Sequence, residues 1–265
     1  MPAISRARAF CLPAHLVGFA GALAMLVVGA AAPGPAAAGT MTEITSGSEK
    51  IQAYVALPVG GAKKGGPAVV VIQEWWGLND WVKSVADRFA QQGFVAIAPD
   101  LYRGQVATEP ELAHELMRGL PDERAIRDVR AAAAHVRSTA GGGAKKVGVI
   151  GFCMGGRLSL LSALDKGPFD ASVLCYGSPE TNPARLKTLK APVLGIFGGA
   201  DRGIGADQTD ALKAGLAKAK RRGEVFVYAG AQHGFLNDSR PLQHDPASSL
   251  LAWKEIEEFF VTNLK

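Results

Sequence analysis

The sequence contains few residues that could cross-link the chain or hold a metal. Only three cysteines occur in 265 residues, and no two of them form a C-x-x-C pair. A disulfide scaffold and a zinc site built on paired cysteines are therefore excluded. A phosphate-binding glycine loop and a prosthetic-group motif are also missing, so we expect neither a cofactor nor a metal.

Neither positive nor negative charge strongly predominates, and the sequence contains no internal repeat. The chain has 29 basic and 24 acidic side chains, which gives a formal net charge of +5. The one basic cluster, Lys218, Lys220, Arg221 and Arg222, falls near the end of a predicted helix, where cations complement the dipole. It lacks the interleaved aromatic residues of a single-strand-binding groove, so we expect no nucleic-acid partner.

The first 38 residues differ in composition from the rest of the chain. Arg6 and Arg8 precede an uninterrupted apolar stretch, Leu16–Ala32, and small residues follow up to Ala38. This pattern predicts a signal peptide at residues 1–38 and a periplasmic or secreted protein that meets the membrane only transiently. An uncleaved N-terminal anchor is one alternative, because the apolar stretch approaches the length of a spanning helix. Translation from Met41 is another, and it would give a cytoplasmic product.

Residues 39–265 alternate between short runs rich in Val and Ile and longer helical stretches. Uninterrupted apolar runs are typical of strands buried on both faces of a parallel sheet. Regular alternation without a compositional break predicts one doubly wound α/β domain. We expect two strands within 43–57, further strands at 68–73, 95–98, 147–151, 171–176, 193–197 and 225–228, and helices at 81–92, 109–119, 122–139, 155–165, 208–222 and 248–263.

The clearest chemical motif is Gly151-Phe152-Cys153-Met154-Gly155. It ends an apolar run and opens a helical segment, which is the G-x-nucleophile-x-G pattern of a strand–turn–helix elbow. The glycines leave room for a sharp, strained turn, and the helix N-terminus favours negative charge on the sulfur. The alternative is a buried structural cysteine beside closely packed glycines, but the strand–turn–helix context favours a nucleophile.

An elbow of this kind requires an acid and then a histidine later in the chain, each after a strand. Asp201 follows the run PVLGIFGGA, and His233 follows VFVYAGAQ. Both fall where strands of a parallel sheet are expected to end, which is where sites form in such folds. We therefore predict a catalytic triad of Cys153, Asp201 and His233. Cys175 lies within a predicted strand and is expected to be a core residue.

Together with the elbow, three further motifs resemble the dienelactone hydrolase family, a group of carboxymethylenebutenolidase-like enzymes. They are Gln73-Glu74-Trp75-Trp76-Gly77, Pro99-Asp100-Leu101-Tyr102 and the turn His233-Gly234-Phe235. The similarity extends from about Met41 to Leu264. It implies a single-domain α/β-hydrolase fold, with helices on both faces of a doubly wound, mostly parallel sheet.

The resemblance also implies roles for individual residues. Cys153 would be the nucleophile, His233 the base, and Asp201 the residue that orients the histidine. Glu74 matches the family's additional carboxylate, which holds the resting thiol neutral and exchanges partners when substrate arrives. A carboxylate beside a thiolate disfavours ionisation of the pair, which gives this role a physical basis.

Residues near these motifs are candidates for contact with the substrate. The backbone N–H groups of Trp75 and Met154 are predicted to form the oxyanion hole. Trp76 and Phe235 are predicted to supply apolar walls, with ordinary core packing as the alternative. Asn237 is predicted to donate a neutral hydrogen bond to the substrate.

The sequence departs from the family pattern at the two arginines that bind the substrate carboxylate in dienelactone-cleaving members. One lies four residues after the histidine, where this chain has Asn237, and the other aligns with Pro110. Arg103 and Arg118 are nearby in sequence but do not match by position. Because a bidentate guanidinium is lost at each place, the reaction type is predicted more firmly than the substrate.

We therefore expect a monomeric hydrolase that cleaves a small ester or lactone of the dienelactone type through a thioester acyl-enzyme. A broad-specificity carboxylesterase of the same fold is one alternative. A non-catalytic or redox protein is another, because a free thiol exported to an oxidising compartment is exposed to disulfide formation and oxidation.

Overall fold

The computed structural model describes residues 38–138 and 140–265. The predicted signal peptide lies outside this part of the chain, apart from Ala38, and stays a prediction. The strands are β1 (Thr40–Ser46), β2 (Glu49–Ala56), β3 (Ala68–Ile72), β4 (Val95–Pro99), β5 (Val147–Phe152), β6 (Ala171–Cys175), β7 (Val193–Gly198) and β8 (Gly223–Tyr228). The helices are α1 (Asp80–Gln91), α2 (Pro110–Arg118), α3 (Asp122–Arg137), α4 (Met154–Ala163), α5 (Pro183–Leu186), α6 (Ala206–Ala219) and α7 (Pro246–Leu264).

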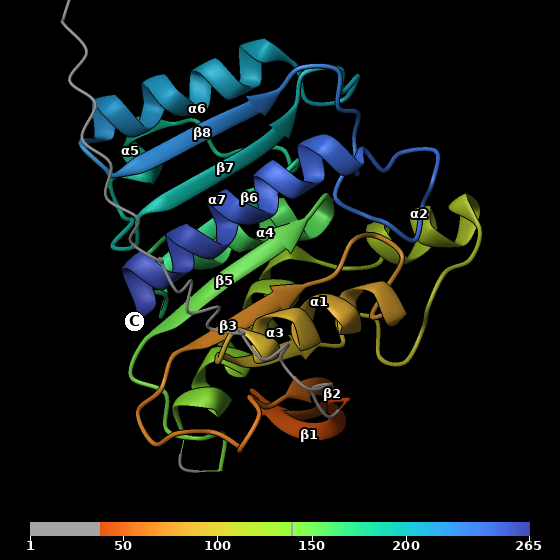
Figure 1. Ribbon diagram of the computed structural model, residues 1–265, viewed down its shortest axis with the longest axis vertical. Helices are drawn as coiled ribbons and strands as arrows, with labels where there is room; N and C mark the ends of the chain where they lie inside the picture. Colours follow the sequence, from red (N-terminus) through yellow and green to blue (C-terminus); the bar gives the residue numbers. More distant parts are fainter. Residues whose placement is uncertain (1–37, 139) are drawn as a thin grey trace, which may run out of the picture. The chain divides into compact units, whose positions relative to one another are not determined.

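The eight strands form one mixed sheet in the order β1-β2-β4-β3-β5-β6-β7-β8 (Figure 1). β1 pairs antiparallel with β2, and β2 pairs antiparallel with β4. The six strands from β4 to β8 in this order pair parallel with one another. The predicted doubly wound, mostly parallel sheet is therefore confirmed, and its two antiparallel pairings lie at one edge.

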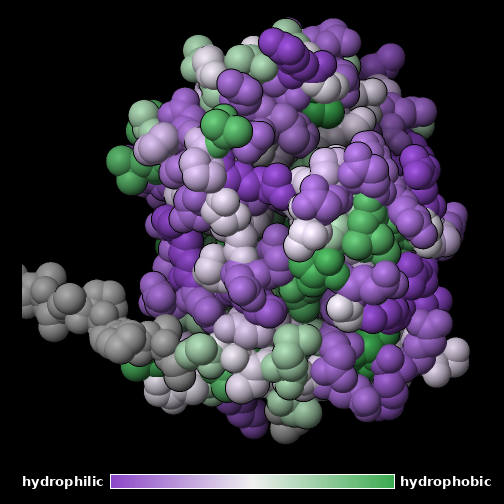
Figure 2. Space-filling view, turned by 90° about the vertical axis from the view of Figure 1, so that its right-hand side faces the viewer, coloured by the Kyte–Doolittle hydropathy of each residue, from purple (hydrophilic) through white to green (hydrophobic). Residues whose placement is uncertain are grey.

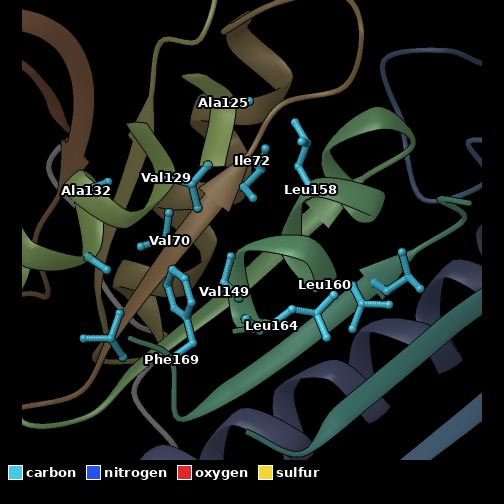
Figure 3. Close-up of a cluster of buried hydrophobic side chains, with 14 of the residues drawn as sticks. Val70, Ile72, Ala125, Val129, Ala132, Val149, Leu158, Leu160, Leu164 and Phe169 are labelled. Carbon is cyan, nitrogen blue, oxygen red and sulfur yellow. The ribbon is translucent and has the colours of Figure 1, made fainter. Parts of the chain in front are cut away.

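Helices cover both faces of this sheet and bury two apolar clusters. On one face, Val70 packs with Val129 of α3 and Leu158 of α4 (Figure 3). On the other face, Val71 packs in a cluster with side chains of α1 and α7, among them Trp81. Because successive side chains of a strand point to opposite faces, a strand between two helix layers is apolar at every position. All five residues of β3 are buried, which accounts for its uninterrupted apolar sequence.

The carboxyl ends of the parallel strands lie together at one edge of the sheet, on the right of Figure 1. The loops after β3, β5, β7 and β8 carry the motifs singled out in the sequence. Figure 2 views the molecule from this side, where hydrophobic side chains gather within a mostly hydrophilic surface. Among the described residues, no helix has the length and apolar character needed to cross a membrane.

The structure contains one short helix that the sequence pattern did not predict. This helix, α5, has four residues, and the Asn182 side chain accepts a hydrogen bond from the N–H of Ala184 at 2.9 Å. Five of the six predicted helices also end one to three residues earlier than expected. α3 ends at Arg137, and α6 ends where Lys220 adopts a left-handed conformation with φ 55°.

A buried aspartate of α3 connects the antiparallel edge to the rest of the domain. Asp128 is fully buried, accepts a hydrogen bond from Ser46 at the end of β1, and pairs with Arg103 at 2.8 Å.

Asp128→Ala leaves the half-buried Arg103 without this partner. We expect the free energy of unfolding to fall by about 3 kcal/mol, measured by urea unfolding. Asp80→Ala, which breaks an exposed pair with Lys83, should cost less than about 1 kcal/mol. Equal effects would contradict the prediction.

Candidate active site

Cys153 lies in the turn between β5 and α4, at the edge where the parallel strands end. Its backbone has φ 54° and ψ −117°, a combination that residues other than glycine rarely adopt. Its N–H donates to the carbonyl of Cys175 at 3.0 Å, and its carbonyl accepts from the N–H of Arg157 at 3.2 Å. Backbone hydrogen bonds therefore hold the strained turn from both sides, while the half-buried thiol faces a cavity.

The glycines of the elbow are required by close approaches of the backbone. A Cβ atom on Gly155 would collide with the carbonyl oxygens of Gln73 and Ile72. A Cβ atom on Gly151 would collide with the carbonyl of Gly155. Because these neighbours are backbone atoms, rotation of a side chain cannot relieve the collisions. The small residues on either side of Cys153 thus allow the helix to start directly behind the thiol.

Asp201 and His233 form a close hydrogen-bonded pair at the same edge. The Nδ1 atom of His233 lies 2.7 Å from Oδ2 of Asp201. The other oxygen of Asp201 accepts from the N–H groups of Gly203 at 2.8 Å and Ile204 at 3.1 Å. Burial alone would raise the pKa of Asp201, but the hydrogen bonds from His233 and the backbone hold it below its usual value. The carboxylate therefore stays ionised beside the imidazole.

Cys153 is the second residue that acts on the imidazole of His233. Burial acts to lower the pKa of His233, but hydrogen bonds and charge interactions with Asp201 and Cys153 outweigh it and raise this pKa to about 10. Since Nδ1 is engaged by Asp201, Nε2 is the nitrogen left for the sulfur. The structure thus brings the three predicted triad residues together, although they come from three loops far apart in the sequence.

Two cavities meet at Cys153 and His233. The larger, of about 540 Å³, is lined by Glu74, Trp75, Trp76 and residues of the loops after β7 and β8. The smaller, of about 270 Å³, is lined mostly by apolar side chains from α2, α4 and neighbouring loops. The sulfur and the imidazole are therefore accessible from both sides, and a substrate could extend into each cavity.

Two residues that line the cavities at Cys153 have backbone N–H groups available for an oxyanion. Among the described residues, no group accepts a hydrogen bond from the N–H of Trp75 or from that of Met154. Met154 is the first residue of α4, so its N–H also has the partial positive charge of a helix N-terminus. This arrangement is compatible with the predicted oxyanion hole.

Comparison with known proteins places this site in a family. The sequence model of the Dienelactone hydrolase family matches residues 51–264. The chain belongs to this family. The resemblance inferred from the motifs is therefore confirmed, and the protein is a dienelactone hydrolase-like hydrolase.

Individual relatives agree with this assignment to the dienelactone hydrolase family. "Protein usf" of Aquifex pyrophilus is 36% identical over 84% of this chain and 97% of its own length. The "Putative carboxymethylenebutenolidase" of Aquifex aeolicus is 35% identical over 86% of this chain and 100% of its own length. The crystal structure of a "Putative Dienelactone Hydrolase" from Klebsiella pneumoniae is 33% identical, with a TM-score of 0.74 over 84% of this chain and 98% of its own. The likeness confirms the α/β-hydrolase fold.

In this member of the dienelactone hydrolase family, Glu74 lines the large cavity but its oxygens are engaged elsewhere. Oε1 accepts from the Tyr176 hydroxyl at 3.3 Å, and Oε2 accepts from the Asn237 side-chain amide at 2.8 Å. Burial raises the pKa of Glu74, although the Asn237 hydrogen bond and the charge of His233 oppose it. The structure shows no hydrogen bond between Glu74 and Cys153, so the predicted contact with the thiol is not present in this arrangement.

Two predicted substrate contacts are wrong. Phe235 and Asn237 are both fully buried, and neither lines the cavities at the catalytic pair. Phe235 packs against Tyr176 and Tyr228 in the core. Asn237 donates to Glu74 and accepts from the N–H and hydroxyl of Ser239, so its amide shapes the loop instead of facing substrate. The loop turns inward after His233, a direction that the sequence alone does not reveal.

Trp76 has both of the roles considered for it, because it packs in the core and also lines a cavity. Its side chain is 6% exposed and packs in a small apolar cluster, yet it also lines the large cavity. The sequence analysis missed its neighbour Arg240, whose guanidinium carbon lies 3.5 Å from the centre of the Trp76 ring. Arg103, which lies near a family arginine in sequence but does not match it by position, pairs with Glu49 and Asp128 and does not line the large cavity.

The site's residues do not form a metal centre. Across residues 38–138 and 140–265, no group of three or more His, Cys, Asp or Glu side chains is placed to hold a metal ion. The chemistry that these side chains can perform is that of a thiol, an imidazole and two carboxyl groups.

Proposed function

We propose that this protein hydrolyses a small ester or lactone through a thioester acyl-enzyme, with Cys153 as nucleophile, His233 as acid and base, and Asp201 as orienting residue. The observation that carries the proposal is that His233 is hydrogen-bonded to Asp201 and lines, together with Cys153, both cavities of the site. A nucleophile, a base and a group that orients the base are the parts that acyl transfer requires.

In the proposed acylation step, the thiol of Cys153 passes its proton to Nε2 of His233, and the sulfur attacks the carbonyl carbon of the ester. The carbonyl oxygen becomes an oxyanion, which the N–H groups of Trp75 and Met154 stabilise. When the C–O bond to the alcohol breaks, Nε2 of His233 gives its proton to the departing oxygen. The products are the alcohol and a thioester on Cys153, and for a lactone the alcohol remains attached to the acyl group.

In the proposed deacylation step, His233 acts as a base. The charge of Cys153 contributes to the raised pKa of His233, and this contribution disappears when the sulfur becomes part of a thioester. The imidazole can then take a proton from an attacking water, and the S–C bond breaks to release the acid. The same nitrogen thus serves as acid in the first step and as base in the second.

We also propose that Glu74 regulates the thiol. Glu74 lines the same cavity as Cys153, and its two carboxyl oxygens accept hydrogen bonds from Tyr176 and Asn237. To reach the sulfur it would have to exchange these hydrogen bonds. Burial raises the pKa of Glu74, so its carboxyl group is protonated to the neutral form more readily than an exposed carboxyl group would be.

The test is hydrolysis of a small activated ester, such as 4-nitrophenyl acetate, by the purified protein. We expect turnover, and we expect rapid acid quenching to give a protein whose mass is increased by one acetyl group on the peptide that contains Cys153. Such a covalent intermediate is the signature of nucleophilic catalysis. Turnover without any acylated Cys153 peptide, or no turnover at all, would overturn the proposal.

A further inference from the structure

Positive charge is concentrated at the edge of the sheet where the parallel strands begin, opposite the cavities and on the left of Figure 1. Six loops lead into β3, β4, β5, β6, β7 and β8 at this edge, namely residues 57–67, 92–94, 138–146, 164–170, 187–192 and 220–222. These entry loops contain ten Lys and Arg residues and only two acidic residues. Because the six strands begin in near register, about 4.8 Å apart, the entry loops lie side by side.

The opposite edge of the sheet has the reverse charge. The loops that leave the same six strands contain three basic and seven acidic residues, and they surround the cavities at Cys153. The formal net charge of +5 is therefore unevenly distributed, with the excess of cations at the edge that has no part in the proposed chemistry.

Most cations of the entry loops are not neutralised by neighbouring carboxylates. The two acidic residues of these loops are already paired with arginines, Asp165 with Arg185 at 3.4 Å and Asp170 with Arg137 at 2.8 Å. Exposed cations of the entry loops that form no ion pair with any described residue include Lys187, Lys190 and Arg222. Their charges are thus available to an anionic partner.

Two further features of this edge indicate what kind of anion it meets. Loop 57–67 exposes two apolar side chains near its lysines, Leu57 with 45% and Val59 with 70% of its surface exposed. The domain's first strand also begins here, because Thr40 pairs with the end of β2 and the end of β2 pairs with the start of β4. The apolar stretch at residues 16–32, predicted as part of a signal peptide or anchor, is therefore attached to the domain at the basic edge.

We propose that the edge formed by the entry loops is a docking surface for an anionic phospholipid bilayer, with the active-site cavities facing away from the lipid. Lys and Arg side chains attract the phosphates of such a bilayer, and exposed apolar side chains add affinity by entering the headgroup boundary. Nucleic acid matches the surface less well, because both aromatic residues of the entry loops, Phe94 and Phe169, are buried and cannot stack on a base. The inference does not depend on the proposed hydrolysis.

The test measures binding of the full chain to vesicles of phosphatidylcholine and to vesicles of an equal mixture of phosphatidylcholine and phosphatidylglycerol. We expect binding to the mixed vesicles to be tighter by about tenfold or more, since each basic residue near an anionic surface strengthens binding about fivefold. Raising the salt from about 0.1 M to about 1 M should remove this preference, because the screening length falls from about 10 Å to about 3 Å. A triple variant with Lys187→Gln, Lys190→Gln and Arg222→Gln should bind the mixed vesicles about tenfold more weakly or less.

The matched control is a second triple variant, with Lys50→Gln, Lys213→Gln and Lys254→Gln, which changes exposed lysines outside the entry loops. Both variants lose the same charge and keep the same N-terminal segment, so they differ only in where the charge is removed. The control should bind the mixed vesicles as the parent does, and circular dichroism should show that both variants are folded.

Three results would overturn the inference. They are equal losses of vesicle binding in the two triple variants, a parent that binds neutral and anionic vesicles equally, and binding to a DNA duplex but not to vesicles. The last result, if the first triple variant abolished it, would assign the basic edge to nucleic acid instead of lipid.

Discussion

Cys153→Ala should reduce ester hydrolysis by about 10⁴-fold or more, to a rate near that of the uncatalysed reaction. The thiol lines both cavities together with His233 and contributes to the raised pKa of the imidazole, and alanine has no atom that can attack a carbonyl. The substitution removes one atom from a half-buried position, so the fold should persist. The rate of hydrolysis of 4-nitrophenyl acetate, measured with the circular dichroism spectrum of the same sample, tests this expectation.

Two variants make the result specific. Cys153→Ser should keep only weak turnover, because a hydroxyl ionises far less readily than a thiol and the imidazole is placed to stabilise a thiolate. Cys175→Ala changes the other described cysteine, which is buried at the end of β6, and should keep most of the activity. Full activity in the Cys153→Ala variant, or a serine variant faster than the parent, is incompatible with the proposed nucleophile.

The positions of the strands in the sequence could be predicted because most of them are buried on both faces of the sheet. The expected run at 68–73 corresponds to β3 (Ala68–Ile72), and that at 193–197 to β7 (Val193–Gly198). What the sequence did not predict was α5, because its four residues are too few to show a helical period. The order of the strands in the sheet could not be predicted either, because an apolar run does not indicate which other strand it pairs with.

The triad could be predicted because its members obey a topological rule. Cys153, Asp201 and His233 follow three parallel strands, and the ends of such strands lie at one edge whatever the intervening sequence. The residues after His233 obey no such rule. Phe235 turns into the core, while Arg240, in an irregular loop, returns to the cavity and stacks on Trp76. Side-chain direction in a loop depends on tertiary contacts, so these positions could not be assigned from sequence alone.

Asp201→Asn should lower kcat/KM at pH 7 by about a hundredfold or more. The hydrogen bond that His233 donates to Asp201 is the largest of the effects that raise the pKa of His233 to about 10, in opposition to burial. An amide carries no negative charge, so the imidazolium loses its main stabilisation and the histidine pKa falls. Less imidazolium at neutral pH means less stabilisation of a thiolate on Cys153 and a weaker acid for the departing alcohol.

The sign of the pH dependence follows from the same shift. In the parent, His233 stays protonated until the pH approaches about 10, so hydrolysis of an ester with a poor alkyl leaving group should decline only near that pH. In Asp201→Asn this decline should move to lower pH, as measured by kcat/KM from pH 5 to 11. Asp207→Asn is the control, because it makes the same chemical change at an exposed residue in the first turn of α6. An alkaline limit that stays in place in Asp201→Asn would show that Asp201 does not set the protonation of His233.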